Sequence, residues 1–268
     1  MIFESIKKKL AIIAVISLLS QLPMQVNAWG MIGHRVVGEI ADSYLNAKAR
    51  KAIQSILGTE SLAMSANWGD FIKSDSAYNY MYNWHFVNLP GGLDKQGVYN
   101  ILESEKAPNL YNKIIDLTAV LKKSGSTVEE KKLALRMLVH MAGDLCQPMH
   151  VAHKEDLGGN KVSVLWFNEK SNLHRVWDEQ LIEYQQLSYT EFSKAINHPS
   201  AVQLYNWRNT SLKDCIYESY LVCGKIYDNT KPDSKLGYRY NFEWVDTLNQ
   251  QLLKGGVRLA KMLNDIYG

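Results

Sequence analysis

Histidine and aspartate recur in this sequence at spacings that suit metal binding. His140 precedes Asp144 by four residues, and His174 precedes Asp178 by the same distance. On a helix, residues four apart project from one face about one turn apart, so both side chains of a pair can reach one metal ion. Imidazole nitrogen and carboxylate oxygen are ligands that suit zinc. The two pairs therefore predict metal sites carried by helices.

Further candidate ligands lie outside these two pairs. Pro148 follows the predicted end of the helix that carries His140, and it should break that helix. His150 would then turn away from the His140 face and could serve a different metal ion. A single His–Asp pair is more often a surface ion pair, but two pairs with additional histidines favour a site for several metal ions. The remaining candidates are Trp29, His34, Asp70 and His85.

The first 28 residues have the pattern of a signal peptide for export. Three consecutive lysines precede an apolar run from Leu10 to Leu19, which is too short to span a bilayer. Small residues, Val26 and Ala28, occupy the third and first positions before the expected cut. Cleavage after Ala28 would give Trp29 a free α-amine, and such an amine can bind metal. A retained membrane anchor is the alternative.

Residues 29–268 are long enough for one large domain with a substantial core. The chain has 30 Lys and Arg against 27 Asp and Glu, and the leader holds three lysines and one glutamate, so the remainder carries about +1. This near-neutral charge argues against non-specific duplex binding by a basic face. In an exported protein, Cys215 and Cys223 could form a disulfide, whereas Cys146 is interpreted as a small buried residue at a helix end.

The apolar pattern predicts a mainly α-helical single domain with a small β-hairpin. Thr127, followed by acidic residues, offers a cap for the helix that carries His140, and Gly58 is a helix stop. Turn residues Gly158 to Asn160 precede an alternating segment, 161–167, which predicts one strand of the hairpin. Loops are expected at 84–97 and 151–160. The predicted helices cover 35–57, 109–123, 127–145, 172–184, 190–196, 201–223 and 242–266.

Taken together, these residues resemble the trinuclear zinc nucleases, which include the fungal single-strand-specific nucleases and the plant bifunctional nucleases. The resemblance runs from Trp29 to Asp178 and keeps the order and spacing of the ligands. It implies the multi-helix fold shared by these nucleases and phospholipase C. The matching positions are Trp29, His34, Trp68-Gly69-Asp70, His85, His140, Asp144, Gln147-Pro148, His150, Gly158-Gly159-Asn160, His174 and Asp178.

The resemblance also implies three Zn²⁺ ions as cofactors and a division of ligands among them. The implied reaction is metal-assisted hydrolysis of phosphodiester bonds to 5′-phosphorylated products, in which zinc activates the attacking water. Asp70 and Asp144 would be catalytic as metal ligands. The three implied ligand sets are Asp70, His85, His140 and Asp144 for one ion; the amine and carbonyl oxygen of Trp29 with His34 and Asp144 for a second; and His150, His174 and Asp178 for the third.

Four residues are predicted to contact the substrate. Lys73 matches a basic residue that faces negative charge developing on the phosphoryl group, and it replaces the arginine of fungal relatives by a point charge. Phe86 matches an aromatic ring on which a base can stack. Asn88 stands where some relatives have aspartate, and Asn160 completes the predicted set. Stacking without sequence readout would explain a preference for single strands over duplexes.

Two other functions remain open at this level. A zinc-dependent phospholipase C has the same scaffold, although its N-terminal ligands are spaced more widely and its last ligand is glutamate instead of Asp178. The second alternative is a secreted protein that sequesters zinc or binds surfaces without turnover. We expect an exported or periplasmic monomer that spans no membrane after processing and acts on single-stranded nucleic acid or mononucleotides. His198 is interpreted as an ordinary loop residue, and His153, just beyond His150, could assist in metal binding but is not assigned as a ligand.

Overall fold

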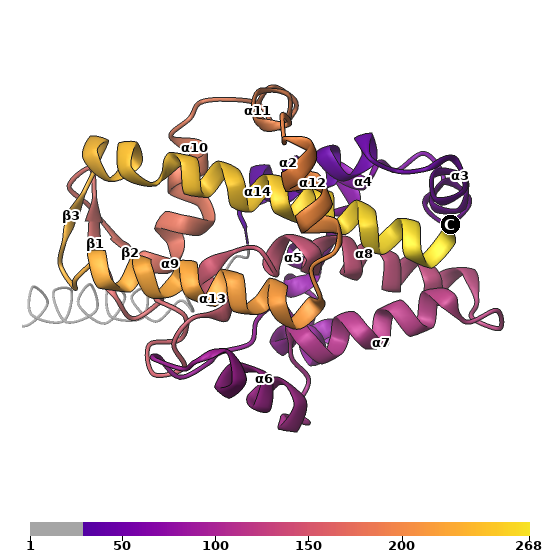
Figure 1. Cartoon of the computed structure of the whole chain (residues 1–268), viewed down its shortest axis with the longest axis horizontal. Coiled ribbons are helices and arrows are strands. Elements are labelled where there is room, and N and C mark those ends of the chain that lie inside the picture. The colour runs from indigo at the N-terminus through magenta and orange to yellow at the C-terminus, as the bar shows by residue number, and fades with distance from the viewer. Residues whose placement is uncertain (1–28) are drawn as a thin grey trace, which may run out of the picture.

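The computed structural model describes residues 29–268, and the predicted leader lies outside them. These residues form a mainly α-helical fold with one small sheet (Figure 1). The helices are α2 (Met31–Ser43), α3 (Ala47–Leu57), α4 (Leu62–Ser65), α5 (Trp68–Phe71), α6 (Lys95–Ser104), α7 (Leu110–Lys122), α8 (Val128–Asp144), α9 (Leu173–Arg175), α10 (Leu181–Glu183), α11 (Tyr189–Ile196), α12 (Ala201–Arg208), α13 (Leu212–Asn229) and α14 (Tyr238–Tyr267).

Shorter helical turns link several of these helices close to the predicted ligands. Three are 3₁₀ turns, η1 (Ile72–Ser74), η2 (Ser76–His85) and η3 (Pro148–Val151). A π-helical turn, η4 (Val176–Gln180), joins α9 to α10, so the predicted helix 172–184 is continuous but locally widened. Pro148 does end the α-helical path after α8, as predicted, and it starts η3.

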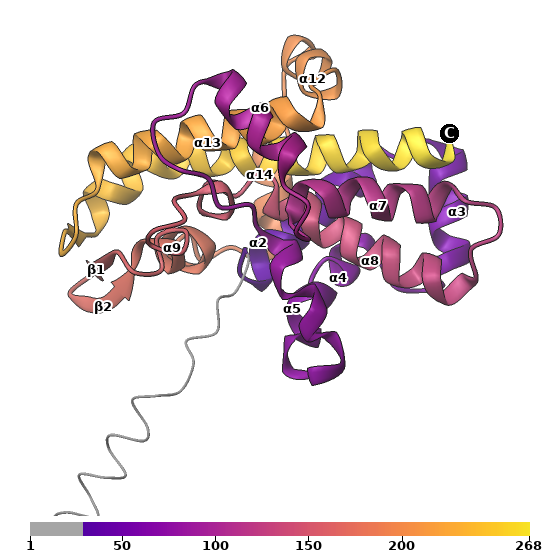
Figure 2. The ribbon, with the colours of Figure 1, turned by 90° about the horizontal axis from the view of Figure 1, so that it is seen from below.

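Helix α8 forms the centre of the core. Its N-terminus carries a capping box, in which Thr127 Oγ1 accepts from the Glu130 amide and the Glu130 carboxylate accepts from the Thr127 amide at 2.7 Å. This confirms the predicted helix start. From Ala134 to Asp144 nearly every residue of α8 is buried, with α7 packed along one side (Figure 2). The last turns of α8 are therefore held inside the protein.

Helix α14 packs along α2 and also contacts α8. The approach to α2 is close because Gly255 and Gly256 lie at the contact. A Cβ atom on Gly256 would lie 2.4 Å from Cγ2 of Ile40, which is shorter than any real contact. Through this contact, the C-terminal helix fixes the helix that carries His34.

Two predicted helices are each divided into two. The segment 35–57 breaks between α2 and α3, where the Asn46 side chain accepts from the Ala49 amide at 2.8 Å. The segment 201–223 breaks between α12 and α13, where Ser211 Oγ accepts from the Asp214 amide at 3.1 Å. Both breaks are internal N-caps within an apolar pattern that continues through them. The predicted stop at Gly58 is confirmed, because this residue has φ 67° and ends α3.

The predicted hairpin is confirmed. Strand β1 (Ser163–Trp166) pairs antiparallel with β2 (Glu169–Asn172), and the two turn residues, Phe167 and Asn168, both have positive φ. A two-residue strand, β3 (Lys235–Leu236), pairs parallel with β1. It was not predicted, because two residues carry no alternating pattern.

The predicted disulfide between Cys215 and Cys223 is wrong. Both residues lie on the single helix α13, where eight residues correspond to about 12 Å along the axis. A disulfide requires Cα atoms about 4.4–6.8 Å apart, so a regular helix keeps these two side chains apart. All three cysteines are buried and unpaired, and Cys146 lies just beyond the end of α8, as expected. Among the described helices, none combines the length and apolar character needed to cross a bilayer.

Candidate metal centre

The structure brings eight predicted ligand side chains together around the C-terminal end of α8. All are buried except Asp70, whose side chain is 13% exposed. They come from separate segments, so the fold and not local sequence assembles the centre. The contributors are His34 from α2, Asp70 from α5, His85 from the end of η2, His140 and Asp144 from α8, His150 from η3, His174 from α9 and Asp178 from η4.

The first group of side chains surrounds one carboxylate oxygen of Asp144. Its Oδ2 atom lies 3.2 Å from Nδ1 of His85 and 3.3 Å from Nε2 of His140. The two histidine nitrogens are 2.9 Å apart. Three donor atoms thus converge within a space that a single metal ion could occupy.

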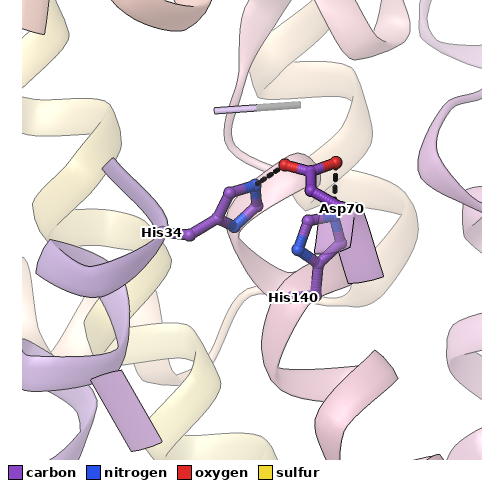
Figure 3. Close-up of side chains that lie close together, drawn as sticks. All are labelled: His34, Asp70 and His140. Atoms are coloured by element: carbon purple, nitrogen blue, oxygen red, sulfur yellow. Dashed lines mark ion pairs between the residues drawn. The ribbon is translucent and has the colours of Figure 1, made fainter. Parts of the chain in front are cut away.

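The second group lies on the other side of His140. Figure 3 shows His34 and His140 turned toward Asp70, and the two imidazole rings are stacked with centroids 3.9 Å apart. Nε2 of His34 lies 3.9 Å from Oδ2 of Asp70 and 3.5 Å from Oδ1 of Asp144. Asp144 therefore contacts both the first and the second group through different oxygens.

The third group is formed by His150, His174 and Asp178. Nε2 of His174 lies 2.8 Å from Oδ2 of Asp178, and Nε2 of His150 lies 3.6 Å from Oδ1. The Gln147 amide donates a hydrogen bond to the same Oδ1. His150 also faces the first two groups, because its Nδ1 is 3.4 Å from Oδ1 of Asp144. The three groups adjoin one another.

Backbone oxygens fix three of the histidine rings. The carbonyls of Ala66, His85 and Gly158 lie 2.7 Å from Nδ1 of His140, His150 and His174, in that order. A carbonyl can only accept, so each Nδ1 carries a hydrogen and each Nε2 points toward the carboxylates. This pattern of outer hydrogen bonds is typical of metal-binding histidines.

Gly158 is needed for the last of these hydrogen bonds. Its φ is 66°, a left-handed conformation that glycine adopts without strain. A Cβ atom on this residue would lie 2.6 Å from the carbonyl oxygen of Met149. The predicted Gly-Gly-Asn turn therefore orients the His174 ring through its Nδ1 atom, on the side opposite Nε2.

Burial and neighbouring charges have opposite effects on the pKa values of several side chains in the centre. Burial lowers the pKa of His34 to about 3 and the pKa of His85 to about 4. Burial alone would raise the pKa of Asp144, but His140 and His150 hold it well below its usual range. These pKa values keep His34 and His85 neutral, the form that binds a metal ion. Asp144 and Asp178, in contrast, raise the pKa of His150 to about 9 against its burial, so this imidazole would release a proton on binding a metal ion.

Several buried polar atoms of the predicted ligands have no hydrogen-bond partner within residues 29–268. They include both ring nitrogens of His34, Nε2 of His150 and Oδ1 of Asp144. Leaving buried polar atoms unpaired costs about 1–3 kcal/mol each, so such a cluster is unfavourable unless a ligand satisfies it. The donor set of imidazole nitrogens and carboxylate oxygens fits zinc.

Comparison with known proteins decides the class of this centre, since residues 29–268 match the S1/P1 nuclease family. The chain belongs to this family. It is similar to Endonuclease 3 of Arabidopsis thaliana, with 31% identity over 95% of this chain and 94% of the relative. It is also similar to Nuclease P1 of Penicillium citrinum, with 29% identity over 90% of this chain and 98% of the relative. The predicted family and the assignment to hydrolases of phosphodiester bonds are confirmed.

The start of the matched S1/P1 nuclease region is anchored at the centre. The indole of Trp29 is fully buried, and its Nε1 donates to the carbonyl oxygen of Gly143 at 2.7 Å. The amide of Gly30 donates to the carbonyl oxygen of Asp178 at 2.6 Å. Trp29 and Gly30 are thus hydrogen-bonded to the backbone of the last turn of α8 and of η4, the two elements that carry Asp144 and Asp178.

The predicted substrate residues of this S1/P1 nuclease lie around the centre. Nζ of Lys73 is 2.6 Å from Oδ1 of Asp70. Phe86 follows His85 directly, and its half-buried ring meets Tyr82 edge-on at 5.9 Å. Asn88 lies beside the Gly158 turn, and Asn160 in the same turn donates to the Leu157 carbonyl at 2.8 Å. Neither His153, stacked on Tyr227 at 4.1 Å, nor the exposed His198 joins the three groups.

Two supporting residues were missed as functional residues. Gln147 orients Asp178, and its place between Asp144 and Pro148 in the recognised motif was an available signal. Gly69 lies against His140, because a Cβ atom there would be 2.6 Å from Cδ2 of the imidazole. Only the folded packing of α5 on α8 reveals this second requirement.

Proposed function

We propose that residues 29–268 form a zinc-dependent endonuclease that hydrolyses phosphodiester bonds of RNA and single-stranded DNA, leaving 5′-phosphorylated products. The proposal includes 3′-nucleotidase activity on mononucleotides and export after removal of residues 1–28. The observation that carries it is the convergence of eight buried or nearly buried histidine and aspartate side chains into three adjoining groups. The printed names of the relatives, Endonuclease 3 and Nuclease P1, support the substrate class.

The residues present fit three zinc ions. When bound, zinc supplies Lewis-acid activation of water and neutralises charge on the phosphoryl group. The separate contacts of the two Asp144 oxygens support a bridging role for this carboxylate. The proposed ligand sets remain Asp70, His85, His140 and Asp144; Trp29, His34 and Asp144; and His150, His174 and Asp178. The buried anchoring of Trp29 supports its place in the second set.

Lys73 and Phe86 add a positively charged group and an aromatic stacking surface to the carboxylates and imidazoles of the proposed ligand sets. The Lys73 ammonium, next to Asp70, is a positive charge placed to stabilise negative charge that develops on the phosphoryl oxygens. The Phe86 ring offers a surface on which an unpaired base can stack. Asn88 and Asn160 provide amide groups near the third ligand group. Because a duplex keeps its bases paired and stacked, this arrangement favours single strands.

One experiment tests the metal content and the substrate class together. The protein beginning at Trp29 is purified, its zinc is counted per chain by elemental analysis, and hydrolysis is measured on RNA, single-stranded DNA, duplex DNA, a 3′-mononucleotide and phosphatidylcholine. We expect about three zinc ions and faster cleavage of single strands than of duplex. Rapid lipid cleavage with inert nucleic acid, or a purified protein without zinc, would overturn the proposal.

A further inference from the structure

A cleft of about 650 Å³ opens beside the metal centre, and none of the four proposed substrate residues lines it. Asp70 and Asp178, two of the proposed zinc ligands, line it, so it adjoins the metal centre directly. Phe86, Asn88 and Asn160 do not line it. A cleft of this size is within the range that binds small organic groups. The proposed function assigns it no occupant.

The cleft has an exposed aromatic wall. Phe71, the residue after Asp70, is 81% exposed, although its backbone belongs to the ordered helix α5. Trp68 lies on the same short helix, where its ring is held edge-on by Tyr78 at 5.6 Å. Exposed apolar side chains that gather at a cleft mark a binding surface more often than isolated ones do. Phe71 therefore offers a free ring face directly next to a proposed metal ligand.

The side-chain amide of Asn67, which also lines the cleft, lacks hydrogen-bond partners. Its Oδ1 and Nδ2 atoms are both buried, and neither has a hydrogen-bond partner within residues 29–268. The residue precedes α5 but makes no side-chain cap hydrogen bond to it. A buried amide offers an acceptor and donors, the combination that recognises the polar edge of a nucleobase.

The charges that line the cleft favour a base over a phosphate. Glu60, Glu179 and Glu183 line it with the single cation Arg35, and the two lining aspartates are proposed zinc ligands, whose charge a bound ion would neutralise. Arg136 beside Glu60 and Arg175 beside Glu179 offset part of this negative charge, while the carboxylate oxygens remain hydrogen-bond acceptors. Carboxylates repel phosphate but can accept hydrogen bonds from the exocyclic amino groups of bases.

We propose that this cleft binds the nucleobase on the opposite side of the scissile phosphate from the base at Phe86, with Phe71 as the stacking surface and Asn67 as the contact to the base edge. This inference rests on the proposed nuclease function, because it assigns a second base site to the same reaction. The enzyme would then hold a dinucleotide by both bases, one on each side of the centre.

Dinucleotides that lack one base provide the test. We compare d(ApA) with two analogues in which either the first or the second adenine is absent, and we measure kcat/KM for each. Stacking is worth about 1–3 kcal/mol per base, so the original protein should lose about tenfold on removal of either base. Phe71→Ala should become insensitive to removal of one base and stay sensitive to the other. Phe86→Ala should show the reverse pattern.

The controls separate a base site from general damage. Phe242→Ala removes a ring of similar exposure, 83%, from α14, away from the cleft, and it should keep the original sensitivity to both bases. Zinc content of Phe71→Ala should equal that of the original protein, which shows that Asp70 is undisturbed. Asn67→Ala should change the preference among bases at the position that Phe71 serves.

The outcomes distinguish this inference from the function on which it rests. If the original protein cleaves none of the dinucleotides or longer single strands, the proposed function fails. If it cleaves them but Phe71→Ala remains sensitive to both bases, or loses sensitivity to the same base as Phe86→Ala, the second base site is wrong. An equal loss on all three dinucleotides would also overturn it, because Phe71 would then have only a structural role.

Discussion

The part of the chain from Trp29 to Asp178 and the helices that follow it contribute to the metal centre in different ways. The first part supplies every proposed ligand. The second part supplies none, but it holds the end of α8: Ser219 Oγ donates to the Leu145 carbonyl at 2.8 Å, and Gln251 Nε2 donates to the Cys146 carbonyl at 2.7 Å. These carbonyls follow Asp144 directly. The residues from Trp29 to Asp178 therefore supply the proposed ligands, and the helices that follow them hold the end of α8 in position.

The sharpest test of this division is Asp144→Asn. Removing the carboxylate that contacts the first and second groups should lower kcat/KM by about a thousandfold or more, since metal activation is worth several kcal/mol. Zinc content should fall with it. The matched control is Asp265→Asn, an exposed aspartate on α14 paired with Lys261, which should leave both quantities unchanged. An undiminished nuclease rate in Asp144→Asn would show that the bridging assignment is wrong.

The second prediction concerns the amino end at Trp29. A protein that retains Ala28 replaces the proposed ligating amine by an amide, so its kcat/KM should fall by more than about tenfold, or about 1.4 kcal/mol. The comparison is with a protein that begins at Trp29, and zinc affinity is measured in both. One extra residue after Gly268 serves as the control for added length. Equal activity of all three proteins would remove Trp29 from the ligand set.

The same division explains how far the sequence could predict the structure. His140 with Asp144, and His174 with Asp178, were recognisable because four-residue spacing on a helix is a local property. The proximity of His34 to Asp70 is a long-range contact, since α2 packs against α4 through Gly38 and against α14 through Gly256, and no local pattern encodes this packing. Ligand order therefore indicates that a centre exists, whereas the contacts between ligands on different helices are seen only in the folded chain.

Errors in the C-terminal region have a related cause. The apolar pattern continues through Ser211, so the N-cap that starts α13 was not recognised, although a serine three residues before Asp214 is a cap signal. The predicted disulfide rests on an exported context and a short spacing, neither of which shows that the two side chains meet. A regular helix keeps Cys215 and Cys223 too far apart, and this constraint becomes visible only when α13 is seen to be continuous.

A third, smaller effect is expected from Gln251→Ala in the supporting region. It leaves the Cys146 carbonyl without its buried donor, which should lower the free energy of unfolding by about 1–3 kcal/mol. Denaturant unfolding measures this change. The exposed neighbour Gln250 provides the matched control, because Gln250→Ala removes a side chain of the same type at the surface. Similar values for the two variants would mean that Gln251 does not hold the end of α8.

The smallest effect is expected from adding a reducing agent. This treatment tests whether α13, part of the supporting region, is continuous, and we expect no change. A disulfide typically contributes about 2–5 kcal/mol to small exported domains, so losing one would shift unfolding clearly. Because helix α13 separates Cys215 from Cys223, we expect the same unfolding midpoint with and without tris(carboxyethyl)phosphine. Thiol titration in denaturant should count three free cysteines in protein beginning at Trp29. A count of one, with a lower midpoint after reduction, would mean that α13 is broken in solution, and the hydrogen bond from Ser219 to the end of α8 would then need another explanation.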